Sequence, residues 1–242
     1  MTSASSPVDL IKSGPHWFYR IKPLPYKSDR FGRLRSVRDV VGKSIVKYRG
    51  WDFPVMPGPK DEQQSREYYG GTVNWRGCAE YWRMHLSGQF VYMSQLREHV
   101  DVGWSSDRDR AIQRHVGEHR FQSKPNGIVD FVNLVWTTTE FIEFAGRLLE
   151  SGMKADHLDF TVRLAGIRGF LVVSSPEHRI PLLYQATDDA VEWHVTRPAA
   201  IALGDRRGIA SHCAVRLLEQ FGWTDASESV IADVQAELVH GS

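Results

Sequence analysis

Residues 128–152 have the sequence Ile128-Val-Asp-Phe-Val-Asn-Leu-Val-Trp-Thr-Thr-Thr-Glu-Phe-Ile-Glu-Phe-Ala-Gly-Arg-Leu-Leu-Glu-Ser-Gly152. The apolar side chains recur every three or four positions, which is typical of a helix with a wide apolar face. A glycine stands where such a helix should end. The pattern therefore predicts a long helix from about Ile128 to Glu150 that is largely buried at the centre of the fold.

Strands are predicted after this helix. Residues 158–164 alternate apolar and polar side chains, which is typical of a half-buried strand. The glycines of Gly166-Ile-Arg-Gly169 predict a turn into a second strand over 170–173, so that the two strands form a hairpin. The same alternation predicts a further strand over 191–195.

The segment before the helix is rich in aromatic and β-branched residues, which favour strands. It predicts strands at His16–Lys22, Ser44–Phe53, Gly70–Trp75, Glu80–Leu86 and Gln89–Leu96. A short helical turn is expected between the first two strands, at Ser36–Lys43. The Ser87-Gly88 pair predicts a tight turn between the last two strands.

Two helices are predicted at the C-terminal end, one from Ile209 to Phe221 and one that begins at Asp225 with a capping-box-like pattern. The expected fold class is α+β, with mainly antiparallel sheet packed on the long central helix and with C-terminal helices. We expect residues 1–15 to form a mobile tail and residues 16–242 a single two-lobed domain. The charged stretch 103–127 has few apolar residues and is the expected boundary between the lobes.

Composition excludes several classes of protein. The chain has 242 residues, of which 42% are hydrophobic and 24% charged, so it can bury a substantial core. Two cysteines are too few for a disulfide framework, and neither a signal peptide nor a membrane-spanning stretch is recognisable. The phosphate-binding and dinucleotide-binding glycine motifs, the G-x-S-x-G nucleophile motif and the kinase signature are missing. We therefore expect a cytoplasmic, non-enzymatic protein without a cofactor and without membrane contact.

The near-neutral net charge of +1 conceals a strongly basic segment. Residues 20–49 contain ten Lys or Arg and two acidic residues, a local balance of +8. Tyr26, Phe31 and Tyr48 are interleaved with these cations, so the segment could neutralise phosphates and stack on bases. Its candidate binding residues are Arg20, Lys22, Arg30, Arg33 and Arg35. The simpler alternative is that these cations pair with acids of the same chain or across an oligomer interface.

A second candidate binding site combines polar groups with aromatic walls, as small-ligand pockets do. Its residues are Arg49, Trp51, Asp52, Tyr81, Trp82 and Arg83. The alternative is an Arg–Asp pair that fixes the end of a strand.

A metal site is a third possibility, because His115-Val-Gly-Glu118-His119 matches the inverted zinc-peptidase pattern. Histidines at i and i+4 of a helix can both bind zinc, and the glutamate can then activate water. The helix has little apolar support and contains a glycine, which favours a solvated helix face over a zinc-dependent hydrolase.

Four segments in combination resemble a bacterial family. They are Val46–Pro54, Glu80–Arg83, Ser87–Phe90 and Thr139–Leu148. Over roughly residues 44–173 they are similar to the accessory domain that follows the Schlafen/AlbA-type nucleic-acid-binding domain in some bacterial proteins. The resemblance implies a binding, sensing or accessory role beside a nucleic-acid-associated or antiviral defence module, and it brings no catalytic residues. This chain has no room for the Schlafen/AlbA-type domain itself, so a stand-alone copy would act through a partner chain.

The sequence thus favours a non-enzymatic binding or accessory protein whose partner is a protein or a nucleic acid held by the basic segment 20–49. The zinc-dependent hydrolase is the first alternative. The second is a structural subunit that forms homo-oligomers through its basic and acidic faces.

Overall fold

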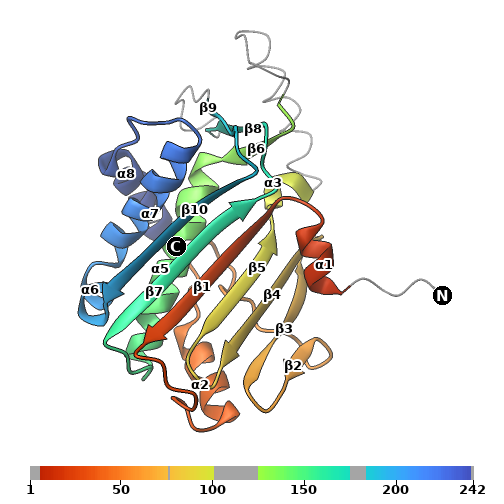
Figure 1. The fold of residues 1–242 in the computed structure, drawn as a ribbon, viewed down its shortest axis with the longest axis vertical. Coiled ribbons are helices and arrows are strands. Elements are labelled where there is room, and N and C mark those ends of the chain that lie inside the picture. The colour runs from red at the N-terminus through yellow and green to blue at the C-terminus, as the bar shows by residue number, and fades with distance from the viewer. Residues whose placement is uncertain (1–5, 76, 101–124, 175–183, 241–242) are drawn as a thin grey trace, which may run out of the picture.

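The computed structural model describes residues 6–75, 77–100, 125–174 and 184–240. Its main element is a seven-stranded antiparallel sheet with the strand order β10-β7-β1-β5-β4-β3-β2 (Figure 1). In chain order these strands are β1 (His16–Leu24), β2 (Glu62–Gln64), β3 (Tyr68–Trp75), β4 (Cys78–His85), β5 (Phe90–Gln95), β7 (His157–Ala165) and β10 (Ala190–Pro198). The expected α+β class with mainly antiparallel pairing is confirmed.

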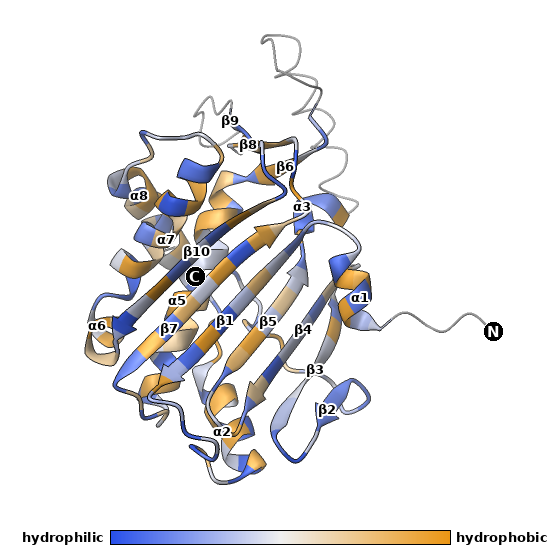
Figure 2. Cartoon of the chain, in the orientation of Figure 1, coloured by the Kyte–Doolittle hydropathy of each residue, from blue (hydrophilic) through white to orange (hydrophobic). Residues whose placement is uncertain are grey.

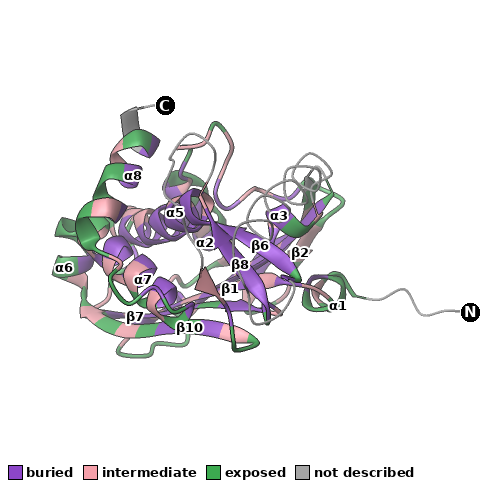
Figure 3. Cartoon of the chain, turned by 90° about the horizontal axis from the view of Figure 1, so that it is seen from above, coloured by how far each residue is buried: buried purple, intermediate pink, exposed green. Residues whose placement is uncertain are grey.

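Helices cover one face of this sheet, which we call the covered face (Figure 3). They are α2 (Leu34–Ser44), α5 (Phe131–Glu150), α6 (Ala199–Gly204), α7 (Arg206–Gln220) and α8 (Glu228–His240). The opposite face, called the open face, carries the short helix α1 (Pro7–Lys12), whose Ile11 packs on Ala79 and Met93. No helix among the described residues is long and apolar enough to cross a membrane.

The alternation of side chains along β1 explains why the sheet has two different faces. Trp17, Tyr19 and Ile21 are buried under the helices, whereas Arg20 and Lys22 point to the open face. Hydrophilic and apolar residues alternate in the same way along β7 and β10 (Figure 2). Because successive side chains of a strand point to opposite faces, the sequence pattern alone assigns each residue to one of them.

The expected central helix is α5, and its burial is confirmed: 14 of its 20 residues are buried. It begins at Phe131, three residues later than expected, because Gly127–Asp130 form strand β6. The side chain of Asp130 caps the helix by accepting a hydrogen bond from the amide of Asn133 at 2.7 Å. Because the strand and the start of the helix are both apolar, the periodicity of the sequence does not show where one ends and the other begins.

The predicted hairpin of 158–164 with 170–173 is wrong. Strand β7 belongs to the large sheet, whereas β8 (Phe170–Val173) lies in a three-stranded sheet of order β6-β8-β9, where β9 is Tyr184–Gln185. Gly166 and Gly169 both have positive φ, at 74° and 76°. The turn therefore moves the chain from one sheet to the other, and β8 pairs in parallel with β6.

The predicted strand Ser44–Phe53 is also wrong. The expected helical turn at 36–43 is the eleven-residue helix α2, which extends through Ser44. After it, only Val46 and Phe53 pair, as an isolated bridge. Gly50 between them has φ 78°, so the chain folds back on itself as a loop. Three buried valines of α2 pack this helix against the covered face of the sheet.

The ends of the chain differ from expectation in two details. Residues 7–12 form α1, capped by Ser6, so the predicted tail does not include them. At α8 the hydroxyl of Ser227, and not Asp225, accepts from the helix amide of Val230 at 3.4 Å. Most of the expected lobe boundary at 103–127 lies outside the described residues.

Candidate functional site

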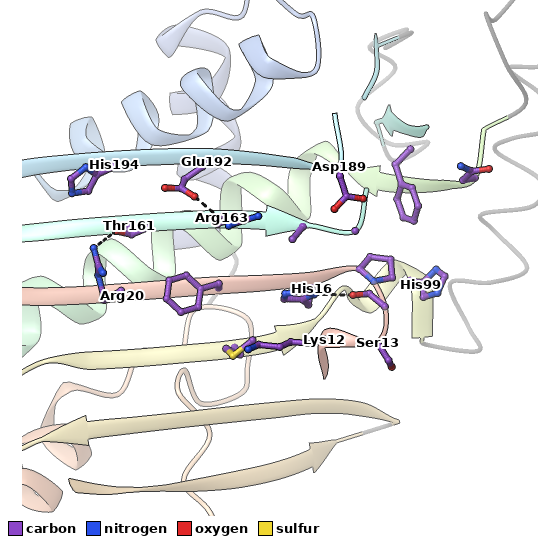
Figure 4. Close-up of a pocket in the computed structure, with 18 residues that line it drawn as sticks. Lys12, Ser13, His16, Arg20, His99, Thr161, Arg163, Asp189, Glu192 and His194 are labelled. Carbon is purple, nitrogen blue, oxygen red and sulfur yellow. Dashed lines mark hydrogen bonds and ion pairs between the residues drawn. The ribbon is translucent and has the colours of Figure 1, made fainter. Parts of the chain in front are cut away.

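The open face is hollowed by a groove of about 1020 Å³ (Figure 4). Its floor is made by the strands β1, β7 and β10, and the end of α1 forms one wall. The helix α3 (Arg97–Val100) contributes His99 at one end. The charged or hydroxyl-bearing residues that line it are Lys12, Ser13, His16, Arg20, His99, Thr161, Arg163, Asp189, Glu192 and His194.

Strand register brings two arginines together on the floor of the groove. Phe18 of β1 lies opposite Arg163 of β7, and Arg20 lies opposite Thr161. Arg20 donates to the hydroxyl of Thr161 at 2.9 Å and to Asp159 at 3.4 Å. Its side chain is still 36% exposed, and that of Arg163 is 49% exposed. Both guanidinium groups can therefore still reach a ligand.

The basic segment 20–49 is divided among several environments. Arg20 and Lys22 lie on the open face, whereas Arg49 is buried under the sheet. Arg30 donates to the backbone carbonyls of Ser87, Pro25 and Lys154 and so holds a loop. Three of the ten cations pair with acids of the same chain outside the groove, in Arg38–Glu62, Lys47–Asp52 and Arg49–Glu140. Internal pairing thus accounts for part of the segment.

The remaining cations gather around α2. Lys27, Arg33, Arg35 and Lys43 are exposed and have no acidic partner among the residues that the structure describes. Together with Arg38 we call them the basic surface. Tyr26, which precedes it, is 66% exposed, an unusual position for a large aromatic side chain.

The start of α2 concentrates cations at the positive end of a helix dipole. Arg33 is the N-cap residue, its side chain makes no capping hydrogen bond, and the first turn contains no acidic residue. Arg35 follows within that turn. Cations at this end are unfavourable by about 0.3–1 kcal/mol each, whereas an anion there is stabilising. The start of α2 is therefore favourable for a bound phosphate.

The second predicted set is not brought together. Arg49, Trp51 and Asp52 lie on the side of the covered face, as does Trp82, which is fully buried. Tyr81 and Arg83 are its neighbours on β4 and therefore point to the open face. The six residues thus line no common pocket, and Trp82 donates its indole N–H to the carbonyl of Val55 at 2.7 Å as a core residue does.

Arg49 and Trp51 belong instead to a buried polar cluster that the sequence did not reveal. We define the inner cluster as Arg49, Glu80, Arg97, Glu98 and Glu140. Arg49 pairs with Glu140, and Arg97 pairs with Glu80 at 3.3 Å. The ring of Trp51 lies between the two guanidinium groups, 4.9 Å from one and 4.6 Å from the other.

The space beside the inner cluster is a cavity of about 20 Å³, which holds roughly one water molecule and no larger ligand. The cluster is therefore structural. Burial alone would lower the pKa of Arg49, but the carboxylate of Glu140 more than offsets this and the pKa is raised. Burial raises the pKa of Glu80, because the neighbouring Arg97 offsets the loss of solvent only in part.

Glu98 is the least compensated acid of the inner cluster. Its Oε1 accepts from the amide of Asp130 at 3.1 Å and from the side chain of Asn133 at 2.9 Å. Its Oε2 has no hydrogen-bond partner among the residues that the structure describes. Burial therefore raises the pKa of Glu98 above its ordinary value.

A pH-dependent stability difference follows for Glu98→Gln. The folded protein holds the Glu98 proton more tightly than the unfolded chain, so this group lowers stability as pH rises from about 4.3 through the raised pKa. Glutamine removes that effect. In urea unfolding between pH 4 and pH 8, the variant should gain stability relative to the native protein as pH increases. The control Asp233→Asn, at an exposed position of α8, should show no comparable trend. A stability difference that falls with pH would contradict this assignment of Glu98.

The predicted zinc motif, His115, Glu118 and His119, lies outside the described residues. Within the described part of the chain, no group of three or more His, Cys, Asp or Glu is arranged to hold a metal ion. The hydrolase alternative therefore receives no support from the rest of the fold.

The edge of the sheet at β10 is blocked against strand pairing. The side-chain amide of Gln220 donates to the carbonyl of Glu192 at 2.8 Å and accepts from the amide of the same residue at 2.9 Å. It thus takes the place that a neighbouring strand would occupy. Natural sheets avoid edge-to-edge association by such coverage, so pairing of β10 between two copies is disfavoured.

The fold and the two surface sites define an α+β protein that has a groove on one sheet face and an exposed basic helix near the other. Comparisons with models of protein families, with curated proteins and with solved structures find no match. The resemblance noted in the sequence stays a prediction.

Proposed function

We propose that this protein is a non-enzymatic accessory protein that binds a single-stranded nucleic acid on its basic surface. The observation that carries the proposal is the start of α2, where Arg33 and Arg35 stand at the positive end of the helix and the first turn contains no acidic residue. The arrangement is unfavourable in the free protein and becomes favourable once a phosphate binds there.

The dimensions of the basic surface suit a short polyanion. An eleven-residue helix is about 16 Å long. Lys43, near its far end, therefore lies several phosphates away from Arg33 at its start. Exposed aromatic rings stack on unpaired bases, and Tyr26 supplies such a ring beside the cations. The exposed ring favours a single strand over a duplex, whose bases are already stacked.

The proposal also includes a biological setting. We propose that the protein acts in the cytoplasm as a partner of a nucleic-acid-associated or defence module on another chain, as the resemblance over residues 44–173 implies. The single-stranded nucleic acid would then be the substrate or the trigger of that partner.

Neutralising the basic surface tests the proposal. The triple variant Arg33→Gln, Arg35→Gln, Lys43→Gln should bind a fluorescent single-stranded oligonucleotide at least tenfold more weakly in anisotropy titrations at 100 mM salt. Each phosphate contact contributes about 0.7 to the slope of log affinity against log salt. The slope should therefore decrease by about 2 in magnitude.

A matched control removes the same charge elsewhere. Arg168, Arg207 and Arg216 are exposed cations outside the basic surface, and their triple substitution by glutamine should leave binding nearly unchanged. Tyr26→Ala should weaken binding of the single strand and leave duplex binding unchanged, because only unpaired bases can stack on the ring. If the native protein binds no nucleic acid at low salt, or if both triple variants lose affinity equally, the proposed site is wrong.

A further inference from the structure

The groove on the open face is a second site, separate from the basic surface. It lies on the face that carries α1, whereas α2 lies on the covered face with α5 (Figures 1 and 3). Its volume of about 1020 Å³ is at the upper end of the range for small-molecule sites and far exceeds the cavity of the inner cluster. The proposed function assigns no ligand to this groove.

We propose that this groove binds a nucleotide, with the base stacked on Phe18 and the phosphates held between Arg20 and Arg163. The three side chains form a triangle on the floor. Phe18 and Arg20 are two residues apart on β1 and so share a face, and Arg163 is the cross-strand partner of Phe18. The register therefore places one aromatic residue and two arginines at adjacent positions on the same face of the sheet.

The ring of Phe18 is held in place for stacking. It packs against the apolar cluster of Ile11, Ala79 and Met93 beneath α1, and it also lines the groove. Because these neighbours restrict the ring, little conformational entropy is lost when a base stacks on it.

The two arginines have capacity for phosphate. Arg163 makes a long ion pair with Glu192, at 3.9 Å, and its side chain is 49% exposed. Arg20 uses its Nη2 for Thr161 and Asp159, and its Nε is buried. Its side chain is 36% exposed, and the exposed part of the guanidinium group is what can reach a phosphate. Asp159 also accepts from His194 at 2.8 Å and from Thr196 at 3.3 Å, so its charge is shared among three partners. Guanidinium groups bind phosphate oxygens through paired hydrogen bonds.

Acidic residues of the groove lie on the side of β10 and its preceding loop. Figure 4 shows Asp189 and Glu192 there, with Lys12 on the opposite side. Carboxylates on one side repel phosphate and can accept hydrogen bonds from the amino group of a base, whereas the ammonium of Lys12 attracts phosphate. Glu192 pairs with Arg163 at 3.9 Å, so a phosphate on Arg163 would replace this long contact and leave the carboxylate to accept from the base.

The proposal is tested by calorimetric titration of the full-length protein with ATP, AMP and inorganic pyrophosphate. ATP should bind more tightly than AMP, because it carries more phosphate, and more tightly than pyrophosphate, which lacks the ring. Arg163→Gln should weaken ATP binding at least tenfold. Phe18→Leu, which keeps apolar packing under α1, should weaken ATP and leave the weak binding of pyrophosphate unchanged. Arg168→Gln, an exposed cation outside the groove, serves as the control.

Two further experiments are needed. The first distinguishes a free nucleotide from the end of a strand, and the second distinguishes the groove from the basic surface. A 5′-phosphorylated hexanucleotide that competes with ATP in the groove identifies the end of a strand as the ligand, and lack of competition identifies a free nucleotide. The triple variant of the basic surface should retain ATP binding. No ATP binding by the native protein, or equal losses in Arg163→Gln and Arg168→Gln, overturns the groove proposal and leaves the basic surface untouched.

Discussion

Replacing Glu140 by glutamine should lower the free energy of unfolding by about 3–5 kcal/mol, because the charge of Arg49 would then be buried without a partner. The two side chains are 7% and 0% exposed, so water cannot take over the role of the carboxylate. Arg49 also donates to Asn133 at 2.6 Å, but a neutral amide does not compensate a full charge. Urea unfolding monitored by tryptophan fluorescence measures the effect.

A control and a rescue make this result specific. Asp52→Asn breaks the pair with Lys47, whose side chain is 70% exposed, and should cost less than about 1 kcal/mol. The double variant Arg49→Met, Glu140→Leu replaces both charges by apolar groups and should recover most of the stability lost in Glu140→Gln. If Glu140→Gln costs no more than Asp52→Asn, the inner cluster does not stabilise the fold.

Gly70→Ala should destabilise the protein by about 3 kcal/mol or more, because the added methyl group would overlap with backbone atoms. A Cβ at this position would lie 2.1 Å from the carbonyl oxygen of Trp82 and 2.7 Å from the Cα of Arg83. Both atoms belong to β4, the hydrogen-bonded neighbour of β3. The overlap can be relieved only by separating the two strands, which also moves the fully buried Trp82.

Gly42→Ala is the matched control for this substitution. Gly42 lies exposed within α2, and no atom would lie within 4 Å of an added Cβ. Alanine there should stabilise the protein by about 0.5–1 kcal/mol, because glycine is unfavourable in a helix. Thermal unfolding of the two variants should therefore shift in opposite directions. Equal shifts would mean that the close approach of β3 and β4 at Gly70 is not present in solution.

Local patterns predicted most element types correctly. The period-two alternation over 158–164 and the helical spacing over 131–150 reflect burial of one face, which each segment shows by itself. The strand predicted at 44–53 failed because aromatic and β-branched residues also occur in loops that pack on a core, as Val46 and Phe53 do. The hairpin of 158–164 with 170–173 failed because a glycine turn does not state to which sheet its second strand belongs.

Some of the candidate functional sites could be predicted from the sequence, and others could not. The basic segment was visible in the sequence because charge is a local property, and its strand residues could be assigned to one face by alternation. The inner cluster was not visible, because Arg49 and Glu140 are 91 residues apart and a glutamate in a helix ordinarily faces solvent. The groove depends on the register of β1 with β7, which places Phe18 beside Arg163.

The amino-acid sequence by itself therefore determined the α+β class, the buried central helix and the position of the basic segment along the chain. Each of these follows from the periodicity or the composition of a short stretch of sequence. Tertiary structure alone decided which cations are buried, which pair and which face solvent, and it separated the six residues 49, 51, 52, 81, 82 and 83 between the two sides of one sheet. Such pairings depend on contacts between residues far apart in the chain, which no local pattern encodes.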